Sequence, residues 1–124
     1  MSVTSKILIL TLLLFAPPLA EAQDAHGRVE YSPIAHLKNF ALSACIANGY
    51  KSDEVKKDAN AAAGGYLELG SFPIEAYEEA ASLGKKFLAK EYRSKGGEPL
   101  TLMKCIDLFH SSELDQIAKK YAKK

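Results

Sequence analysis

The sequence contains none of the short motifs that mark common catalytic or nucleotide-binding sites. It has no phosphate-binding P-loop, no Gly-x-Ser-x-Gly, no His-Glu-x-x-His and no Cys-x-x-Cys. Its glycine pairs, Gly64-Gly65 and Gly96-Gly97, lack the strand, loop and helix order in which glycines hold phosphate. No residues predict a metal ion or another cofactor. These absences favour a protein-binding function over an enzyme.

The chain also lacks an excess of charge of either sign. Its 16 basic and 15 acidic residues leave a formal net charge of +1. Nucleic-acid-binding domains are strongly basic. The near-neutral balance therefore argues against nucleic acid as a partner.

Long apolar runs are absent except at the N-terminus. Lys6 precedes an apolar run from Ile7 to Ala16, and Ala20-Glu21-Ala22 matches a cleavage site. We therefore predict a signal peptide over residues 1–22, cleaved after Ala22, and one exported domain over residues 23–124, with no membrane association after cleavage. An uncleaved anchor is the less favoured alternative, because about 20 apolar residues are needed to span a bilayer.

Cysteine is scarce, with only Cys45 and Cys105. In an exported protein the default interpretation is a disulfide. A bond that closes a loop of about 60 residues contributes roughly 4 kcal/mol in the chain-entropy model. The alternative is a reactive thiol with one of the three histidines as its base: His26, His36 or His110.

No segment alternates between apolar and polar residues as a half-buried strand does, and the apolar residues recur at helical spacing. We predict an all-α domain of five helices, with Cys45–Cys105 joining the first to the fourth. Capping serines, prolines and glycines predict helices over residues 33–49, 52–70, 73–93 and 99–109, and from Ser111 or Ser112 onward. In the fourth helix the inward side chains are expected to be Leu102, Cys105, Ile106 and Phe109.

The second helix carries almost no side chain in its middle, from Ala61 to Gly65. Two adjacent glycines inside a helix cost roughly 1 kcal/mol each relative to alanine. A close approach of another backbone would explain that cost. The approaching backbone belongs either to this chain, which is the favoured interpretation, or to a second copy.

Two features could contact a partner: the loop between the third and fourth predicted helices, and the start of the third helix. The loop Ser94-Lys95-Gly96-Gly97-Glu98-Pro99 is rich in glycine, so it is either a plain connector or an element that enters a narrow cleft. The start of the third helix carries Glu75, Glu78 and Glu79. These carboxylates either complement the helix dipole or form an acidic patch for a partner.

Four stretches in order make the chain resemble the periplasmic immunity proteins of type VI secretion amidase effectors. They are Ala44–Tyr50, Asp58–Tyr66, Tyr77–Ala80 and Met103–Asp107, with Ala-Ala-Gly-Gly-Tyr and Lys-Cys-Ile-Asp the most specific pieces. The resemblance implies an all-helical homodimer without catalytic residues. It also implies a target that resembles NlpC/P60 cysteine peptidases and cuts the peptide stems of peptidoglycan.

The resemblance further implies how inhibition works. A loop of one subunit enters the amidase groove, and a helix of the other subunit adds contacts. We assign the loop to Ser94, Lys95, Gly96, Gly97 and Glu98 from its composition. We assign the helical contacts to the three glutamates Glu75, Glu78 and Glu79.

Two other functions remain open from the sequence. One is a periplasmic carrier that holds an apolar small ligand in a cavity lined by Tyr66, Phe87 and Phe109. The other is a hydrolase that uses Cys45 or Cys105 with a histidine. A disulfide between the cysteines would exclude the hydrolase.

Overall fold

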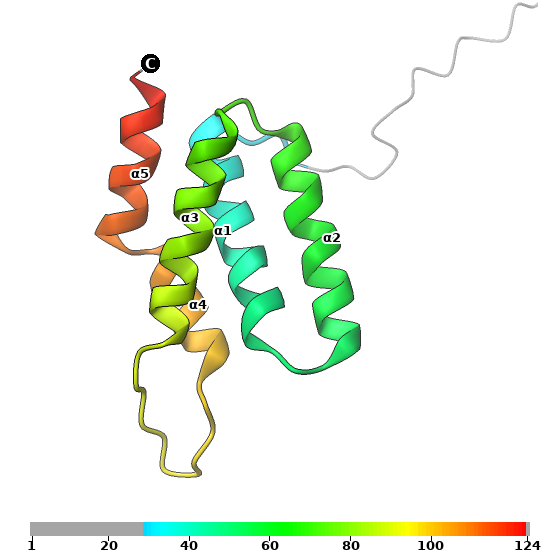
Figure 1. Cartoon of the computed structure of the whole chain (residues 1–124), viewed down its shortest axis with the longest axis vertical. Helices are drawn as coiled ribbons and strands as arrows, with labels where there is room; N and C mark the ends of the chain where they lie inside the picture. Colours follow the sequence, from blue (N-terminus) through cyan, green and yellow to red (C-terminus); the bar gives the residue numbers. More distant parts are fainter. Residues whose placement is uncertain (1–28, 124) are drawn as a thin grey trace, which may run out of the picture.

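The structure, a computed structural model, describes residues 29–123, and within this range it contains five α-helices and no strand (Figure 1). The helices are α1 Pro33–Gly49, α2 Asp53–Leu69, α3 Ile74–Leu88, α4 Thr101–Phe109 and α5 Ser112–Ala122. The predicted all-α class is confirmed. The predicted signal peptide lies outside the described residues.

Serine side chains begin three of the helices, as the sequence predicted. The Oγ atoms of Ser32, Ser52 and Ser111 accept hydrogen bonds from the third backbone N–H that follows, at 3.1, 3.4 and 3.2 Å. A cap of this kind contributes about 1 kcal/mol, because it satisfies a backbone donor that the helix leaves free. The starts of α1, α2 and α5 are thus set by local chemistry.

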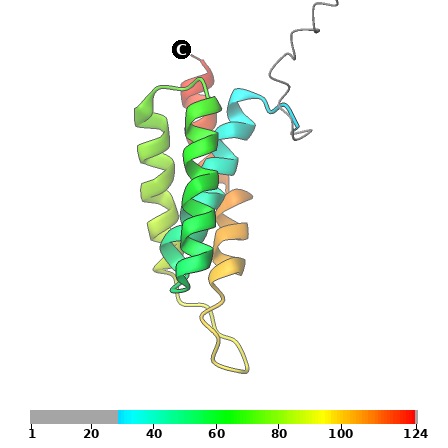
Figure 2. The same ribbon diagram turned by 90° about the vertical axis from the view of Figure 1, so that its right-hand side faces the viewer.

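α1 is the central helix and contacts each of the other four. Its buried positions include Leu37, Ala41, Ala44 and Cys45, and the small alanines let neighbouring helices approach closely. α2 packs chiefly on α1 and lies at the edge of the bundle, as seen in Figure 2, which looks onto α2. One face of α2 is therefore left toward solvent.

The core lies between α1, α3, α4 and α5. Its largest fully buried side chains are Tyr77, Leu37, Leu108, Leu114 and the two cysteines. Tyr77 packs edge-on against Phe40, with ring centroids 5.1 Å apart, and its hydroxyl occupies the space that a side chain on Gly70 would need. Burial raises the pKa of Tyr77 above its usual value. Gly70 is thus required by packing at the corner between α2 and α3.

The disulfide joins α1 to α4. Cys45 and Cys105 are bonded, with their Cα atoms 5.6 Å apart, and no cysteine in the described range is free. The predicted pairing is confirmed. The alternative of a thiol hydrolase is wrong, because both sulfur atoms are used in the bond and neither can act as a nucleophile.

α3 ends at Leu88, five residues before the predicted end at Arg93. The Nζ atom of Lys104, on α4, donates to the carbonyl oxygen of Leu88 at 3.2 Å. This contact satisfies one of the carbonyls that a helix leaves free at its C-terminus and places a positive charge at the negative end of the dipole. Local propensity did not show this end because the partner lies on another helix.

α4 faces the core differently from the prediction. Cys105 and Leu108 are buried, whereas Leu102 and Ile106, which were assigned inward, are exposed. Phe109 is half-buried. A nine-residue helix that packs on α1 and α3 along one side cannot bury apolar residues on both of its sides. The apolar content of α4 thus exceeds what this chain covers.

Candidate functional site

The connection between α3 and α4, residues 89–100, extends beyond the end of the bundle. Both views show it as the yellow loop that projects past the helices (Figures 1 and 2). It contains all five residues assigned to a cleft-entering loop: Ser94, Lys95, Gly96, Gly97 and Glu98. We call it the 89–100 loop.

The base of the 89–100 loop is fastened to α4. The Tyr92 hydroxyl donates to a carboxylate oxygen of Asp107 at 2.5 Å, and this hydrogen bond raises the pKa of Tyr92. The ammonium group of Lys104 donates a hydrogen bond to the carbonyl oxygen of Leu88 at the end of α3, and it lies 5.7 Å from the centre of the Tyr92 ring. α4 is itself bonded to α1 through the disulfide. Both ends of the loop are therefore attached to helices that these bonds hold together.

The tip of the loop has its own hydrogen bonds. The Ser94 hydroxyl donates to the Glu98 carboxylate, and this bond lowers the pKa of Glu98. The backbone N–H of Gly97 donates to the carbonyl oxygen of Ser94 at 3.4 Å. Gly97 has φ +79°, a left-handed conformation that glycine adopts without a steric cost. These features hold the tip in one turn, which lowers the entropy lost when it binds.

The loop closes through a residue with an unfavourable backbone conformation. Leu100 has φ 53° and ψ 36° and immediately precedes α4. A non-glycine residue in this region costs about 1–2 kcal/mol. The surrounding contacts must offset that cost, so the direction in which the loop leaves α4 is strongly determined.

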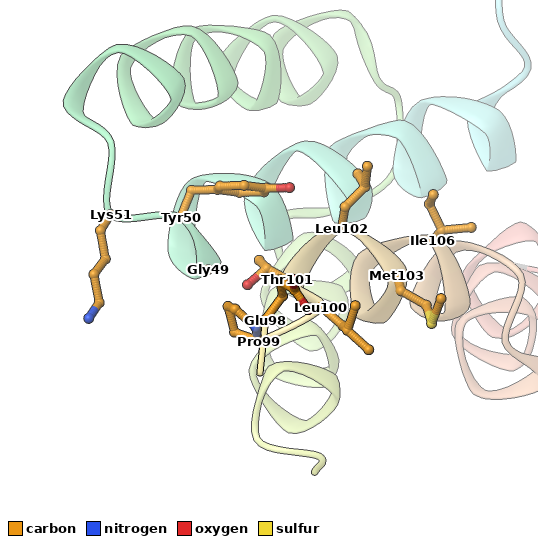
Figure 3. A pocket seen from close by; sticks show the side chains of 10 residues that line it. All are labelled: Gly49, Tyr50, Lys51, Glu98, Pro99, Leu100, Thr101, Leu102, Met103 and Ile106. Atoms are coloured by element: carbon orange, nitrogen blue, oxygen red, sulfur yellow. The ribbon is translucent and has the colours of Figure 1, made fainter. Parts of the chain in front are cut away.

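A groove lies beside the base of the loop (Figure 3). It has a volume of about 910 Å³ and is lined by the end of α1, the α1–α2 turn, the last loop residues and α4. Leu102 and Ile106 extend from α4 toward the side on which the Tyr50 ring lies, while Lys51 extends away from them. The lining residues are Gly49, Tyr50, Lys51, Glu98, Pro99, Leu100, Thr101, Leu102, Met103 and Ile106.

The sequence did not predict this groove. Leu102, Met103 and Ile106 are 49%, 52% and 44% exposed, although all three are large and apolar. The signal that was available is that Lys104 and Asp107 are the only charged residues of α4, so its apolar residues extend beyond the side that carries Cys105 and Leu108. A short helix that is apolar over more than its buried side indicates an outer surface that another body covers.

The three glutamates assigned to helical contacts lie far from the loop. They are on the first turns of α3, whereas the loop leaves its last turn; the rise along the helix separates Glu75 from Leu88 by about 20 Å. Glu75 and Glu78 are exposed. Glu79 accepts from the Lys120 ammonium and the Tyr121 hydroxyl, each at 2.6 Å, and raises the pKa of both. Glu79 therefore already joins α3 to α5.

At the Gly64-Gly65 end of the small-residue stretch, α2 has no close neighbour among the described residues. A Cβ atom added at Gly64 or Gly65 would meet no atom within 4 Å, and Ala61 and Ala62 are exposed. Ala59 and Ala63 form the side that is buried against α1. The favoured interpretation of internal packing at Gly64-Gly65 is therefore wrong, and the face is open in a single copy.

The three rings proposed to line a ligand cavity have separate surroundings. Tyr66 packs against Tyr31 and His36, Phe87 lies under the Lys90 ammonium, and Phe109 lies beside His110. None of the three lines the groove. The geometry thus gives no support to the carrier.

Two tests for other kinds of site are negative for the described part of the chain. No three residues of His, Cys, Asp and Glu lie close enough to hold a metal ion there. Among the helices of residues 29–123, none combines the length and apolar character needed to cross a membrane.

Comparison with known proteins links this geometry to one family. Residues 35–118 match the family described as Tai4, type VI secretion system amidase immunity protein. The chain is 42% identical to a chain in the Tae4/Tai4 effector–immunity structure from Salmonella typhimurium, with a TM-score of 0.69, over 73% of this chain and 89% of that one.

More distant matches share the fold. A chain in the Tae4–Tai4 complex from Enterobacter cloacae is 23% identical, with a TM-score of 0.65, over 71% of this chain and 90% of that one. A chain in the complex of Salmonella typhimurium Tae4 with Enterobacter cloacae Tai4 is also 23% identical, with a TM-score of 0.64, over 71% and 91%. No curated protein sequence matches significantly.

Proposed function

Because the chain belongs to the Tai4 family of type VI secretion system amidase immunity proteins, we propose that it inhibits a cell-wall amidase effector by closing the active-site groove of that enzyme with the 89–100 loop. As an immunity protein of this family it is an inhibitor and not an enzyme. Its cognate partner is an amidase effector that would otherwise damage the producer and its kin.

The observation that carries the loop assignment is the projecting, internally bonded tip. Residues Ser94 to Glu98 extend past the helices, and the Ser94–Glu98 and Ser94–Gly97 hydrogen bonds hold them in one turn. Two adjacent glycines leave the backbone free of side chains, so the tip is narrow. A narrow, ordered tip fills a cleft, excludes substrate and loses little entropy on binding.

A homodimer would explain how the two assigned contact sets reach one effector. The loop and the exposed carboxylates of Glu75 and Glu78 lie at opposite ends of α3, so one copy cannot place both in a single groove. A second copy can supply the carboxylates while the first supplies the loop. The open Gly64-Gly65 face of α2 is the surface we assign to contact between copies.

The protein acts in the periplasm on this proposal. Its disulfide is of a kind that persists in oxidising compartments. Residues 1–22 would act as the signal peptide, cleaved after Ala22. Peptidoglycan amidases act in the same compartment as the mature domain of residues 23–124.

The proposal is tested by co-expressing the protein with a candidate type VI amidase in the periplasm of a susceptible bacterium. Protection from lysis and co-elution of the two purified proteins are expected. Gly97→Val should weaken inhibition about tenfold or more, because valine does not tolerate the left-handed conformation. Gly97→Asn is the matched control, since asparagine tolerates that conformation, and it should inhibit more strongly than Gly97→Val.

Thermal unfolding of each variant separates a changed loop from a changed fold. Equal inhibition by the wild type and Gly97→Val would remove the loop from the mechanism. Lysis with every related amidase tested, in the presence of folded and oxidised protein, would contradict the function itself.

A further inference from the structure

The outer side of α4 carries an apolar surface that the rest of residues 29–123 leaves uncovered. Leu102, Met103 and Ile106 are exposed there, and Figure 3 shows Leu102 and Ile106 extending toward the side on which the Tyr50 ring lies, whereas Met103 extends to the opposite side of the helix. Contiguous exposed apolar surface of this kind marks sites of association.

The groove is continuous with the base of the loop. Glu98, Pro99 and Leu100 are both the last residues of the 89–100 loop and part of the groove lining. An enzyme that encloses the loop tip must bring the rim of its cleft down to this base. The groove is therefore the surface that such a rim meets.

The two sides of the loop base differ in chemistry. On the α3 side, the last turns present Lys85 and Lys86, and Lys90 follows at the start of the loop, all exposed. On the α4 side, the surface is apolar, with Lys51 and Glu98 at its margin. The part of a rim that seats on Leu102 and Ile106 should be apolar, because charged groups placed against these side chains would lose water without gaining partners.

We infer that the groove between Tyr50 and α4 is a second effector-binding surface, which takes an apolar segment from the rim of the amidase cleft while the 89–100 loop enters the cleft. This inference rests on the proposed function and adds to it the residues that anchor the complex. Buried apolar anchors beside a polar loop follow the usual arrangement of tight interfaces, in which a few residues dominate the affinity.

A second copy of this chain is the rival occupant. A contact between two copies through the groove would place each projecting loop against the other copy, at the base where the amidase rim must seat. It would leave the Gly64-Gly65 face of α2 uncovered as well. The effector is therefore the occupant to which we commit.

The test compares two pairs of equally exposed apolar residues. The double variant Leu102→Ser with Ile106→Ser removes the groove surface. The control, Leu69→Ser with Ile74→Ser, removes side chains that are 50% and 52% exposed at the corner between α2 and α3. That corner is at the opposite end of the bundle from the loop (Figure 1). Binding to the purified amidase is measured by calorimetry, and mass by light scattering.

The groove variant should bind the amidase about thirtyfold more weakly or worse, which is the loss expected for dominant interface residues. The control should bind as the wild type does, and both should keep the wild-type mass. If the groove variant does not fold, Met103→Ser, a single change at an exposed position, should show the same direction of change.

Three results would overturn the inference, and they are distinguishable. Equal binding by the groove variant and the wild type would leave the loop as effector contact and remove the groove. A change in mass of the groove variant alone would assign the groove to a second copy. Failure of the wild type itself to bind any related amidase would contradict the proposed function together with the groove.

Discussion

The two glycine pairs of this protein have the same sequence and opposite physical roles. Gly64-Gly65 lies in α2 with helical backbone and open space around it, whereas Gly97 lies in a projecting turn at φ +79°. At Gly96 an added Cβ atom would collide with the Glu98 carboxylate. In the helix the missing side chains leave a flat surface. In the loop they permit a backbone conformation.

The comparison teaches that a glycine pair does not by itself predict close packing. The cost of Gly64-Gly65 in a helix, roughly 1 kcal/mol each, is not offset within this chain. At Gly97 the conformation itself requires glycine. Three changes, in decreasing order of expected effect, test the difference between the α2 pair and the loop pair.

The largest effect should come from the disulfide, which braces the loop end of the molecule and does not involve α2. Replacing both cysteines by alanine should lower the free energy of unfolding by about 4 kcal/mol, since the bond spans 60 residues. Denaturant unfolding measures this loss. Amide exchange should rise more in α4 and the 89–100 loop than around Gly64.

Reduction of the wild-type protein by dithiothreitol is the matched experiment if the double variant does not fold. An equal loss of amide-exchange protection along α2 and α4 would contradict a disulfide that stabilises mainly the loop end of the molecule.

The same substitution should have opposite signs at the two pairs. Gly64→Ala should stabilise the monomer by up to about 1 kcal/mol, since alanine is the better helix former and no atom opposes it. Gly97→Ala should destabilise it by about 1–2 kcal/mol through the left-handed conformation. Thermal unfolding at low concentration compares them. A loss of stability and of dimer mass with Gly64→Ala would show that a second copy packs there.

The smallest effect should be the pH dependence of the loop tip. The Ser94 hydrogen bond lowers the pKa of Glu98 from its ordinary value of 4.5, so the bond stabilises the turn above that value and is lost as the pH falls through the lowered pKa. Ser94→Ala should return the pKa of Glu98 toward 4.5, as measured by NMR titration. The Gly64 amide serves as the internal control, because no titrating contact of this kind is found at it. An unchanged Glu98 titration in Ser94→Ala would contradict the bond.

Much of the fold was predictable because its determinants are local. Ser32, Ser52 and Ser111 cap the helices that follow them, and each cap needs only residues within one turn. Cys45 and Cys105 were the only cysteines, so their pairing needed no geometry. The composition of Ser94 to Glu98 likewise indicated a loop, and the structure places it past the end of the bundle.

The site was predicted only in part, because its other half depends on distant contacts. The sequence shows that the apolar residues of α4 extend over more than one side, but it does not show which of them meet α1 and α3. Leu102 and Ile106 were therefore assigned inward, although Cys105 and Leu108 are the buried residues. The end of α3 at Leu88 is contacted by Lys104, sixteen residues later, which local sequence does not show.

Local features of the sequence predicted a helical chain, a cysteine pair suited to a disulfide and a glycine-rich loop, because periodicity, caps and cysteine count are read within short stretches. The immunity function was implied by the resemblance to a family and not by those features. Tertiary structure alone decided which apolar residues remain exposed, where α3 ends and which glycines lack neighbours. These features depend on how the helices pack against one another. A small bundle has too few helices to cover every apolar side chain, so some of them stay exposed.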